Sequence, residues 1–254
     1  PVAVDSFIYS PEGPLLQIEN ANGYTFLTSG DYTERKNFEG LIEAYVKEFT
    51  SDDKVTLIVK CHYGGFTKKF RRECARRLRD AAMRFNSKNP PRILFWGDKI
   101  SDEAMAALYR SVNCFVSASR GEGLGMQFLE AAASGTPVIH CGWSAQAEYL
   151  NDQNSFPLKY TLKIIDDPEY IRKCVEALNS KLSHVDVDDL RRALRHVVEH
   201  PEHAKKKAVW ALKWVREQTW QRMALALIKE IVNMYNPVSV KTAEHAKEVA
   251  GVAA

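Results

Sequence analysis

The chain has 254 residues, of which 45% are hydrophobic and 26% charged, and 35 basic residues nearly balance 32 acidic ones to leave a formal charge of +3. This balance excludes a disordered or fibrous chain, and so small a net charge gives no reason to expect a nucleic-acid partner. No apolar run approaches the ~20 residues of a membrane-spanning helix, and the N-terminus lacks the pattern of a signal peptide. We therefore expect a cytoplasmic protein; peripheral attachment to the inner face of a membrane stays open but is not indicated.

The first 23 residues carry turn formers and no sustained period, so they are predicted to be a linker or interdomain segment. From residue 24 onward, predicted strands and helices alternate. The expected strands are 24–29, 55–59, 93–96, 114–117 and 138–141, and the expected helices are 38–49, 68–85, 102–110 and 126–134. Nearly continuous apolar strands separated by helices indicate a Rossmann-like, doubly wound parallel sheet, an α/β domain over residues 24–165.

After residue 165 the pattern becomes helical. Helices are expected at 168–182, 187–199 and 201–235, so residues 166–236 are predicted to be C-terminal helices that pack on the domain. Residues 237–254 are expected to form a tail, either a frayed helix or a mobile end.

The five cysteines are widely spaced and include no CxxC pair or Cys/His cluster at metal-ligand spacing. Buried free thiols are therefore expected at all five positions. These are Cys61, Cys74, Cys114, Cys141 and Cys174.

The most informative stretch, residues 117–130, follows a predicted strand and opens a helix. It contains three alternating glycines, Gly121, Gly123 and Gly125. Glycine lets the backbone adopt positive φ and approach a ligand, and the start of a helix presents unpaired N–H groups to an anion such as phosphate. Close packing of strand and helix can demand small residues at the same corner, so the glycines alone leave both interpretations open.

Two glutamates in this stretch favour a ligand. A carboxylate at Glu122, inside a phosphate loop, is electrostatically awkward unless it binds hydroxyl groups of the same ligand, as a sugar would supply. Glu130 falls on the second turn of the predicted helix, where it could face the loop and bind a ribose, or be an exposed residue favoured by the helix dipole. Because its neighbours make this helix apolar nearly all round, we expect Glu130 to be held by partners or by a ligand.

The spacing of Glu122 and Glu130, with the residues between them and on to Ile139, resembles the E-x7-E motif of retaining glycosyltransferases with the two-domain GT-B fold. The similarity is greatest to glycosyltransferase family 4 and the "glycosyl transferases group 1" domain, and it is strong over residues 24–150. It implies the C-terminal, nucleotide-sugar-binding half of a hexosyltransferase-type enzyme of polysaccharide or glycoconjugate synthesis. The acceptor would be a glycan, a lipid-linked molecule or another hydroxyl compound, and an N-terminal acceptor domain would be missing.

The resemblance also implies residue roles. Glu122 would bind the transferred sugar near the reacting centre and Lys36 the diphosphate, as the two catalytic residues, while Glu130 would bind the ribose. Further nucleotide-sugar contacts would come from the phosphate cradle, the segment after the first strand and the loop near the base. These are Gly123, Leu124, Gly125, Met126, Gly30, Arg35, Lys99 and Ile100. No metal and no other cofactor is then required.

One departure from the family pattern is Asp31, which stands where relatives usually have arginine. Arg35 could replace that cation, Asp31 could point away as a loop residue, or the chain could be a non-catalytic nucleotide-sugar-binding or scaffold module of a larger protein. Ser144 is a lesser candidate near the donor, and His140 is expected to be structural. A nicotinamide dehydrogenase is disfavoured because the glycine fingerprint does not follow the first strand.

Overall fold

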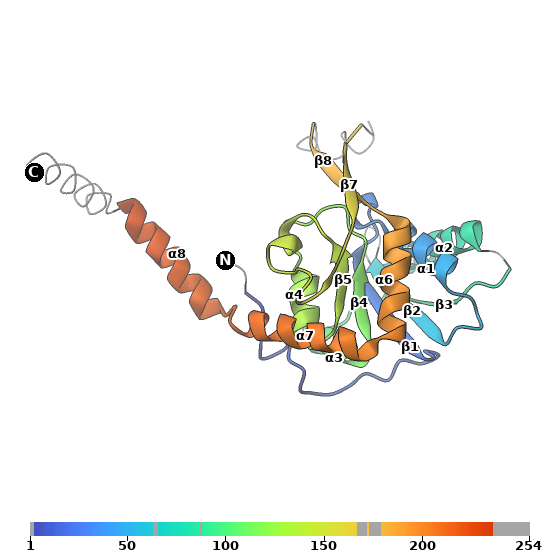
Figure 1. Cartoon of the computed structure of the whole chain (residues 1–254), viewed down its shortest axis with the longest axis horizontal. Helices are drawn as coiled ribbons and strands as arrows, with labels where there is room; N and C mark the ends of the chain where they lie inside the picture. The colour runs from blue at the N-terminus through green and yellow to red at the C-terminus, as the bar shows by residue number, and fades with distance from the viewer. Residues whose placement is uncertain (1–2, 63–65, 87, 167–171, 173–178, 236–254) are drawn as a thin grey trace, which may run out of the picture.

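The computed structural model describes residues 3–62, 66–86, 88–166, 172 and 179–235. A six-stranded parallel sheet forms its centre, in the order β3-β2-β1-β4-β5-β6 (Figure 1). The strands are β1 (Tyr24–Asp31), β2 (Val55–His62), β3 (Arg92–Trp96), β4 (Cys114–Ser117), β5 (Val138–Cys141) and β6 (Phe156–Leu158). This confirms the predicted Rossmann-like, doubly wound α/β fold.

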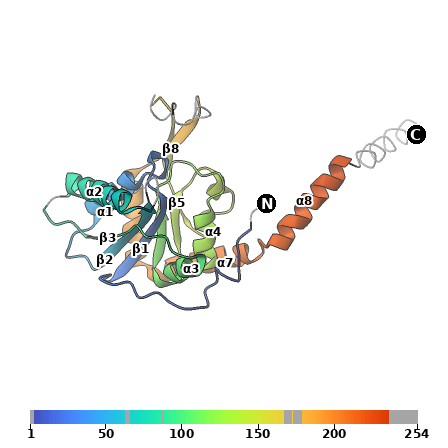
Figure 2. The same cartoon turned by 180° about the vertical axis from the view of Figure 1, so that it is seen from behind.

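Helices cover both faces of this sheet (Figures 1 and 2). On one face, α1 (Phe38–Glu48), α2 (Lys68–Phe85) and α6 (Val187–Glu199) enclose a core with the side chains of β1 and β2. On the other, α3 (Asp102–Ser111) and α4 (Met126–Ala133) build a second core, to which α7 (Pro201–Arg216) contributes its C-terminal half. Central strands are therefore buried on both sides, which explains their continuous apolar sequence.

The predicted elements of residues 24–141 are confirmed, with two useful differences in length. β1 was expected to end at Ser29 and β2 at Val59, but they run on to Asp31 and His62. The two extensions pair with one another, Gly30 opposite Cys61 and Asp31 opposite His62. The strands thus carry Asp31 and His62 beyond the core, at the carboxyl edge of the sheet.

The region after β5 departs from the prediction. β6 adds an unpredicted sixth strand, and β7 (Tyr160–Ile164) pairs antiparallel with β8 (Lys181–Val185) in a separate hairpin. Most of the helix expected at 168–182 lies outside the described residues, but its last two residues belong to β8, so that end of the prediction is wrong. The strand forms there because Ser183 is buried and its N–H donates to the carbonyl of Arg120, a contact that no local pattern signals.

The C-terminal helices and the N-terminal segment also differ in how they pack. α6 has the predicted bounds, whereas the stretch 201–235 divides into α7 and α8 (Trp220–Tyr235). No side chain of α8 is buried, and the helix extends away from the body (Figures 1 and 2). The described part of the N-terminal segment contains no helix or strand, yet Val4 and Tyr9 join the second core. The predicted tail, 237–254, lies outside the described residues.

Four of the five cysteines are described, and all four are buried free thiols as predicted. They are Cys61, Cys74, Cys114 and Cys141, and Cys174 lies outside the described residues. Within the described ranges, no helix combines the length and apolar character needed to cross a membrane.

Candidate active site

The site lies where the order of the strands reverses, between β1 and β4. In doubly wound folds ligands bind at such a switch point, beside the carboxyl ends of the strands. Here residues 32–37 follow β1 and residues 118–125 follow β4. The resemblance had assigned roles in both segments, and the topology brings them together.

Hydrogen bonds fasten these two loops to one another. The backbone N–H of Arg120 donates to the carbonyl of Arg35 at 2.7 Å, and the Asn37 side chain donates to the carbonyl of Ala118 at 3.1 Å. Ser119 lies between them, with its hydroxyl 3.3 Å from the carbonyl of Arg35. The cations of the first loop are therefore fixed relative to the carboxylate of the second.

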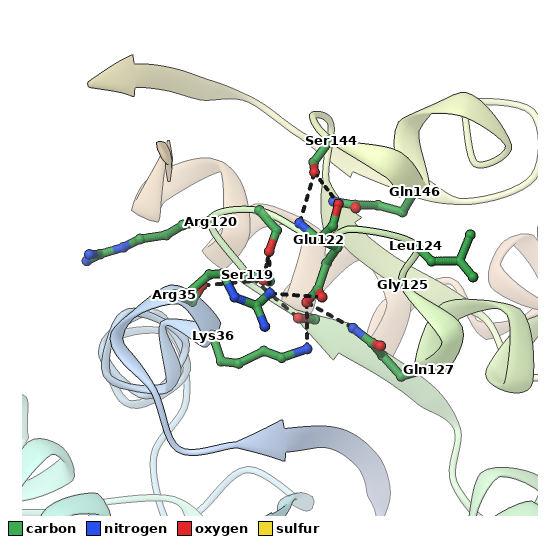
Figure 3. Close-up of polar contacts among 12 residues, drawn as sticks. Arg35, Lys36, Ser119, Arg120, Glu122, Leu124, Gly125, Gln127, Ser144 and Gln146 are labelled. Carbon is green, nitrogen blue, oxygen red and sulfur yellow. Dashed lines mark hydrogen bonds and ion pairs between the residues drawn. The ribbon is translucent and has the colours of Figure 1, made fainter. Parts of the chain in front are cut away.

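That carboxylate is Glu122, whose side chain is only 6% exposed. Lys36 Nζ lies 2.7 Å from its Oε1, Arg35 donates to Oε2 at 3.0 Å, and Gln127 Nε2 donates to Oε1 at 3.0 Å (Figure 3). Burial by itself would raise the pKa of Glu122, but the hydrogen bonds and charges of Lys36, Ser119 and Arg35 outweigh it and hold the pKa below its ordinary value. Glu122 is thus an ionised acceptor at neutral pH, with two cations beside it.

The backbone of Glu122 is held as firmly as its side chain. The Ser144 hydroxyl accepts from the N–H of Glu122 at 2.9 Å and donates to its carbonyl at 2.7 Å. Ser144 follows β5, the next strand of the sheet, so three consecutive strand ends position this one residue (Figure 3). The lesser candidate Ser144 is therefore in direct contact with Glu122.

Two glycines are required by local geometry. Gly30 has φ +141°, and a Cβ there would lie 3.1 Å from Lys36 Cε, so glycine lets the lysine cross the end of β1. Gly125 has φ +76° and caps α4, and a Cβ would come within 2.8 Å of the Phe128 ring. Both predicted glycines therefore have a structural reason that would hold without a ligand.

The loop before α4 leaves backbone donors available. Gly123 and Leu124 are exposed, and the Tyr149 hydroxyl lies 2.9 Å and 3.0 Å from the carbonyls of Leu124 and Gly125, to which it donates. These carbonyls are thus directed at Tyr149. The N–H of Phe128 donates to the Gly125 carbonyl at 2.9 Å, whereas those of Met126 and Gln127, at the first two positions of α4, have no partner within the helix. A helix start of this kind, beside two cations, can accept an anionic group.

Glu130 lies on α4, in a different environment. The hydroxyl of the fully buried Tyr109 donates to its Oε2 at 3.1 Å. Burial raises the pKa of Glu130, the Tyr109 hydrogen bond opposes that rise, and the charge of Asp102 adds to it. The expectation that Glu130 is held by a partner is confirmed, and the partner is one that the sequence interpretation left without a role.

The other predicted residues lie further along the sheet. Lys99 and Ile100 follow β3, two strands away from β1; Ile100 packs on the second core and Lys99 is exposed. Lys60, at the end of β2, donates to the carbonyl of Asp98 at 2.6 Å and so fixes this loop. Ser101 caps α3, its hydroxyl accepting from the N–H of Ala104.

Asp31 and His140 each have a partner. His62 Nε2 lies 2.7 Å from the 60%-exposed carboxylate of Asp31, while Arg35 contacts Glu122. Asp31 is the last residue of β1 and not a loop residue, so that expectation is wrong, and Arg35 is a cation that reaches Glu122. His140 is buried between the Cys141 carbonyl and the Ser155 hydroxyl, and burial lowers its pKa to about 4. It is structural, as predicted.

Sequence reasoning missed Gln127 and the role of Tyr109. Gln127 stands in the first turn of an otherwise apolar helix, a signal that could have found it. The sequence gives no such signal for Tyr109, because an aromatic residue on the inner face of a helix is typical of a hydrophobic core. Within the described ranges, no group of three or more His, Cys, Asp and Glu side chains could hold a metal ion.

The sheet order and the two-loop site define a Rossmann-like domain of the kind that forms the C-terminal half of GT-B glycosyltransferases. The C-terminal domain of a group 1 glycosyl transferase (LpcC) from Francisella tularensis matches 85% of this chain and 98% of its own length, with a TM-score of 0.58 and 19% identity. Anabaena HepE, crystallised with UDP and glucose, matches 89% of this chain and 55% of its own, with a TM-score of 0.61 and 15% identity.

The chain belongs to the family glycosyl transferases group 1, whose model matches residues 23–180. Among curated relatives, the serotype-specific mannosyltransferase WbdA of Escherichia coli is 48% identical over 46 residues, 18% of this chain. The alpha-monoglucosyldiacylglycerol synthase of Streptococcus pneumoniae is 28% identical over 128 residues, 50% of this chain. The matches span only 6% and 25% of those relatives' lengths.

Proposed function

We propose that this chain is the donor-binding part of a retaining glycosyltransferase, which binds a nucleotide-diphosphate sugar and transfers the sugar to a hydroxyl acceptor. The observation that carries the proposal is the contact between Glu122 and Lys36, 2.7 Å apart at the switch point of the sheet. A sugar diphosphate presents hydroxyls and an anion side by side, and this pair presents an ionised acceptor and a cation side by side. Family membership and the UDP complex of HepE support the same ligand class.

The proposed placement of the donor follows from the chemistry of each group. Sugar hydroxyls donate to Glu122, the diphosphate meets Lys36, Arg35 and the N–H groups at the start of α4, and the ribose hydroxyls donate to Glu130. The base then lies toward Lys99 and Ile100, along the carboxyl edge of the sheet. An acceptor domain, contributed by another part of a longer protein, closes the site from the opposite side.

In the proposed reaction the bond between the anomeric carbon and the diphosphate oxygen breaks, and the nucleoside diphosphate leaves with the electron pair. The acceptor oxygen bonds to the same face of that carbon, and its proton passes to the departing phosphate. The chain's own residues orient the sugar and stabilise the charge that develops on the leaving group; such preorganised electrostatic stabilisation is a large part of many enzymes' rate enhancement.

The test is calorimetric titration of the chain with UDP, GDP, ADP and their common sugar conjugates, repeated with Lys36→Ala and Glu130→Ala. Tyr45→Phe, which removes a buried tyrosine hydroxyl bonded to the Arg92 carbonyl, is a control remote from the loops. We expect one diphosphate to bind wild type and the control equally and both site variants at least about tenfold more weakly. Equal binding by all four proteins, or binding by none, would contradict the proposal.

The second candidate is a non-catalytic nucleotide-sugar-binding or scaffold module, which the acidic Asp31 favours. Hydrolysis or transfer of the donor by the full-length protein separates the two. A domain that binds the donor while the full-length protein leaves it intact, with and without hydroxyl acceptors, supports the module and contradicts catalysis.

A further inference from the structure

Tyr109 is the feature of the site that the proposed function does not yet use. Its side chain is completely buried on α3, and its hydroxyl donates to Glu130 Oε2 at 3.1 Å. Among the described residues, Tyr109 is the one whose side chain donates a hydrogen bond to the Glu130 carboxylate. A partly buried carboxylate with one side-chain donor among the described residues leaves its remaining lone pairs for a ligand.

Tyr109 is held in place at its backbone and around its ring. At its backbone, the Thr136 hydroxyl donates to the Tyr109 carbonyl at 2.8 Å. Around its ring, Tyr9 and Phe115 make edge contacts, with centroids 6.2 Å and 5.6 Å away. Tyr109 therefore cannot swing away from Glu130 without disturbing the core.

The other titratable groups around Glu130 do not stabilise its charge. On α3, the charge of Asp102 opposes ionisation of Glu130. Tyr9, from the N-terminal segment, is held neutral by its burial and by nearby carboxylates. His140, on the neighbouring β5, is kept neutral by burial, and the buried face of α7 consists of alanine and valine. Tyr109 is thus the group that favours the carboxylate form.

We infer that Tyr109 is a positioning residue for nucleotide binding, which keeps Glu130 ionised and aimed so that its free lone pairs receive the ribose hydroxyls. This rests on the proposed function, in which Glu130 binds the ribose. Two adjacent hydroxyls need an ionised acceptor, since a protonated carboxyl would turn one acceptor into a donor. The hydroxyl of Tyr109 stays a donor throughout, because burial and the Glu130 charge raise its pKa far above neutrality.

The first measurement needs no nucleotide. The carboxyl carbon of Glu130 is titrated by NMR in wild type, Tyr109→Phe, Asp102→Asn and the control Tyr45→Phe. Losing a hydrogen bond to a charged group should raise the pKa of Glu130 by about one unit or more in Tyr109→Phe. Asp102→Asn should lower it and Tyr45→Phe should leave it unchanged. An unchanged pKa in Tyr109→Phe, with a normal melting temperature, would overturn the inference.

The second measurement asks whether the effect reaches the ligand. UDP, GDP and ADP, with their 2′-deoxy forms, are titrated between pH 5 and pH 8. In Tyr109→Phe, the pH below which the ribonucleotide binds weakly should rise by the same amount as the pKa of Glu130. The variant should also prefer the ribonucleotide over its 2′-deoxy form less strongly than wild type does. If wild type binds no diphosphate, the proposed function and the ribose role fail together. If nucleotides bind and Tyr109→Phe keeps the wild-type pH profile, this inference alone fails.

Discussion

The two glutamates of the site occupy contrasting surroundings. Glu122 lies in a loop, against two cations and an amide, and its pKa is lowered. Glu130 lies eight residues later on an apolar helix, against one tyrosine hydroxyl, and its pKa is raised. Burial acts on both in the same direction, so the difference comes from the partners that each region supplies.

The contrast shows how one motif can serve two purposes. The β4–α4 loop concentrates charge where a phosphate and a reacting sugar would lie, whereas α4 holds a carboxylate in a partly buried, largely apolar setting suited to neutral hydroxyls. The fold stabilises the first glutamate as an ion and tolerates the second at a cost in stability. Variants of each should therefore respond in opposite ways.

The largest expected effect is that of Lys36→Ala. It removes the principal partner of a buried carboxylate and should lower the free energy of unfolding by about 3 kcal/mol, the low end for breaking a buried pair because Arg35 remains. Lys47→Ala, which breaks the exposed pair with Glu43, is the matched control and should cost less than about 0.5 kcal/mol. Urea unfolding of both measures the difference; equal losses would show that the Glu122 cluster is not a structural centre.

Glu130→Gln should act in the opposite direction on stability. Removing a partly buried charge whose one side-chain donor among the described residues is Tyr109 should raise the free energy of unfolding at pH 7, while affinity for the nucleoside diphosphate falls about tenfold. Urea unfolding and calorimetry of the same sample give both numbers. A variant that is less stable than wild type would mean that Glu130 is held by more than Tyr109.

Ser144→Ala should have a smaller effect. The hydroxyl accepts from and donates to the backbone of Glu122, so its loss should lower the free energy of unfolding by about 1 kcal/mol and leave the net charge unchanged. Ser10→Ala is the control, because it removes a hydroxyl that donates to the Glu12 carbonyl at the exposed surface, and little effect is expected. If the two variants unfold alike, the backbone of Glu122 does not depend on Ser144.

The smallest expected effect is on the pH dependence of the free energy of unfolding, to which the two glutamates should contribute in opposite directions. The lowered pKa of Glu122 gives a stabilisation that is present above the ordinary glutamate pKa and lost as pH falls through the folded value. The raised pKa of Glu130 gives a stabilisation that is present below the ordinary glutamate pKa. That stabilisation is lost as pH rises through the pKa of Glu130 in the folded protein. Relative to wild type, Glu122→Gln should therefore lose stability and Glu130→Gln gain it at pH 7, both differences shrinking toward acid pH.

Much of the fold could be predicted from the sequence because the order of strands and helices depends on local patterns. Apolar strands, helix periods and the glycines before α4 predicted the order of elements from 24 to 141, and their placement put Glu122 in the loop after β4 and Glu130 on α4. The β7–β8 hairpin could not be foreseen in the same way, because Ser183 in β8 is anchored to Arg120, 63 residues earlier. Local patterns do not carry contacts of that range.

The contacts between side chains in the site were harder to predict than which residues belong to it. Lys36 and Arg35 reach Glu122 across 86 and 87 residues of chain, and only the resemblance suggested that they meet. Tyr109 and Glu130 face each other from neighbouring helices, where a buried tyrosine is indistinguishable in sequence from an ordinary core residue. Which side chain sets the charge of each glutamate therefore required the structure.

The claim that the two glutamates bind different parts of one ligand is tested most directly by calorimetry of Glu122→Gln and Glu130→Gln with a nucleoside diphosphate and its sugar conjugate. Glu122→Gln should reduce the preference for the conjugate over the diphosphate about tenfold or more, whereas Glu130→Gln should weaken both ligands equally and keep that preference. The claim would be contradicted if Glu122→Gln kept the wild-type preference or if Glu130→Gln abolished it.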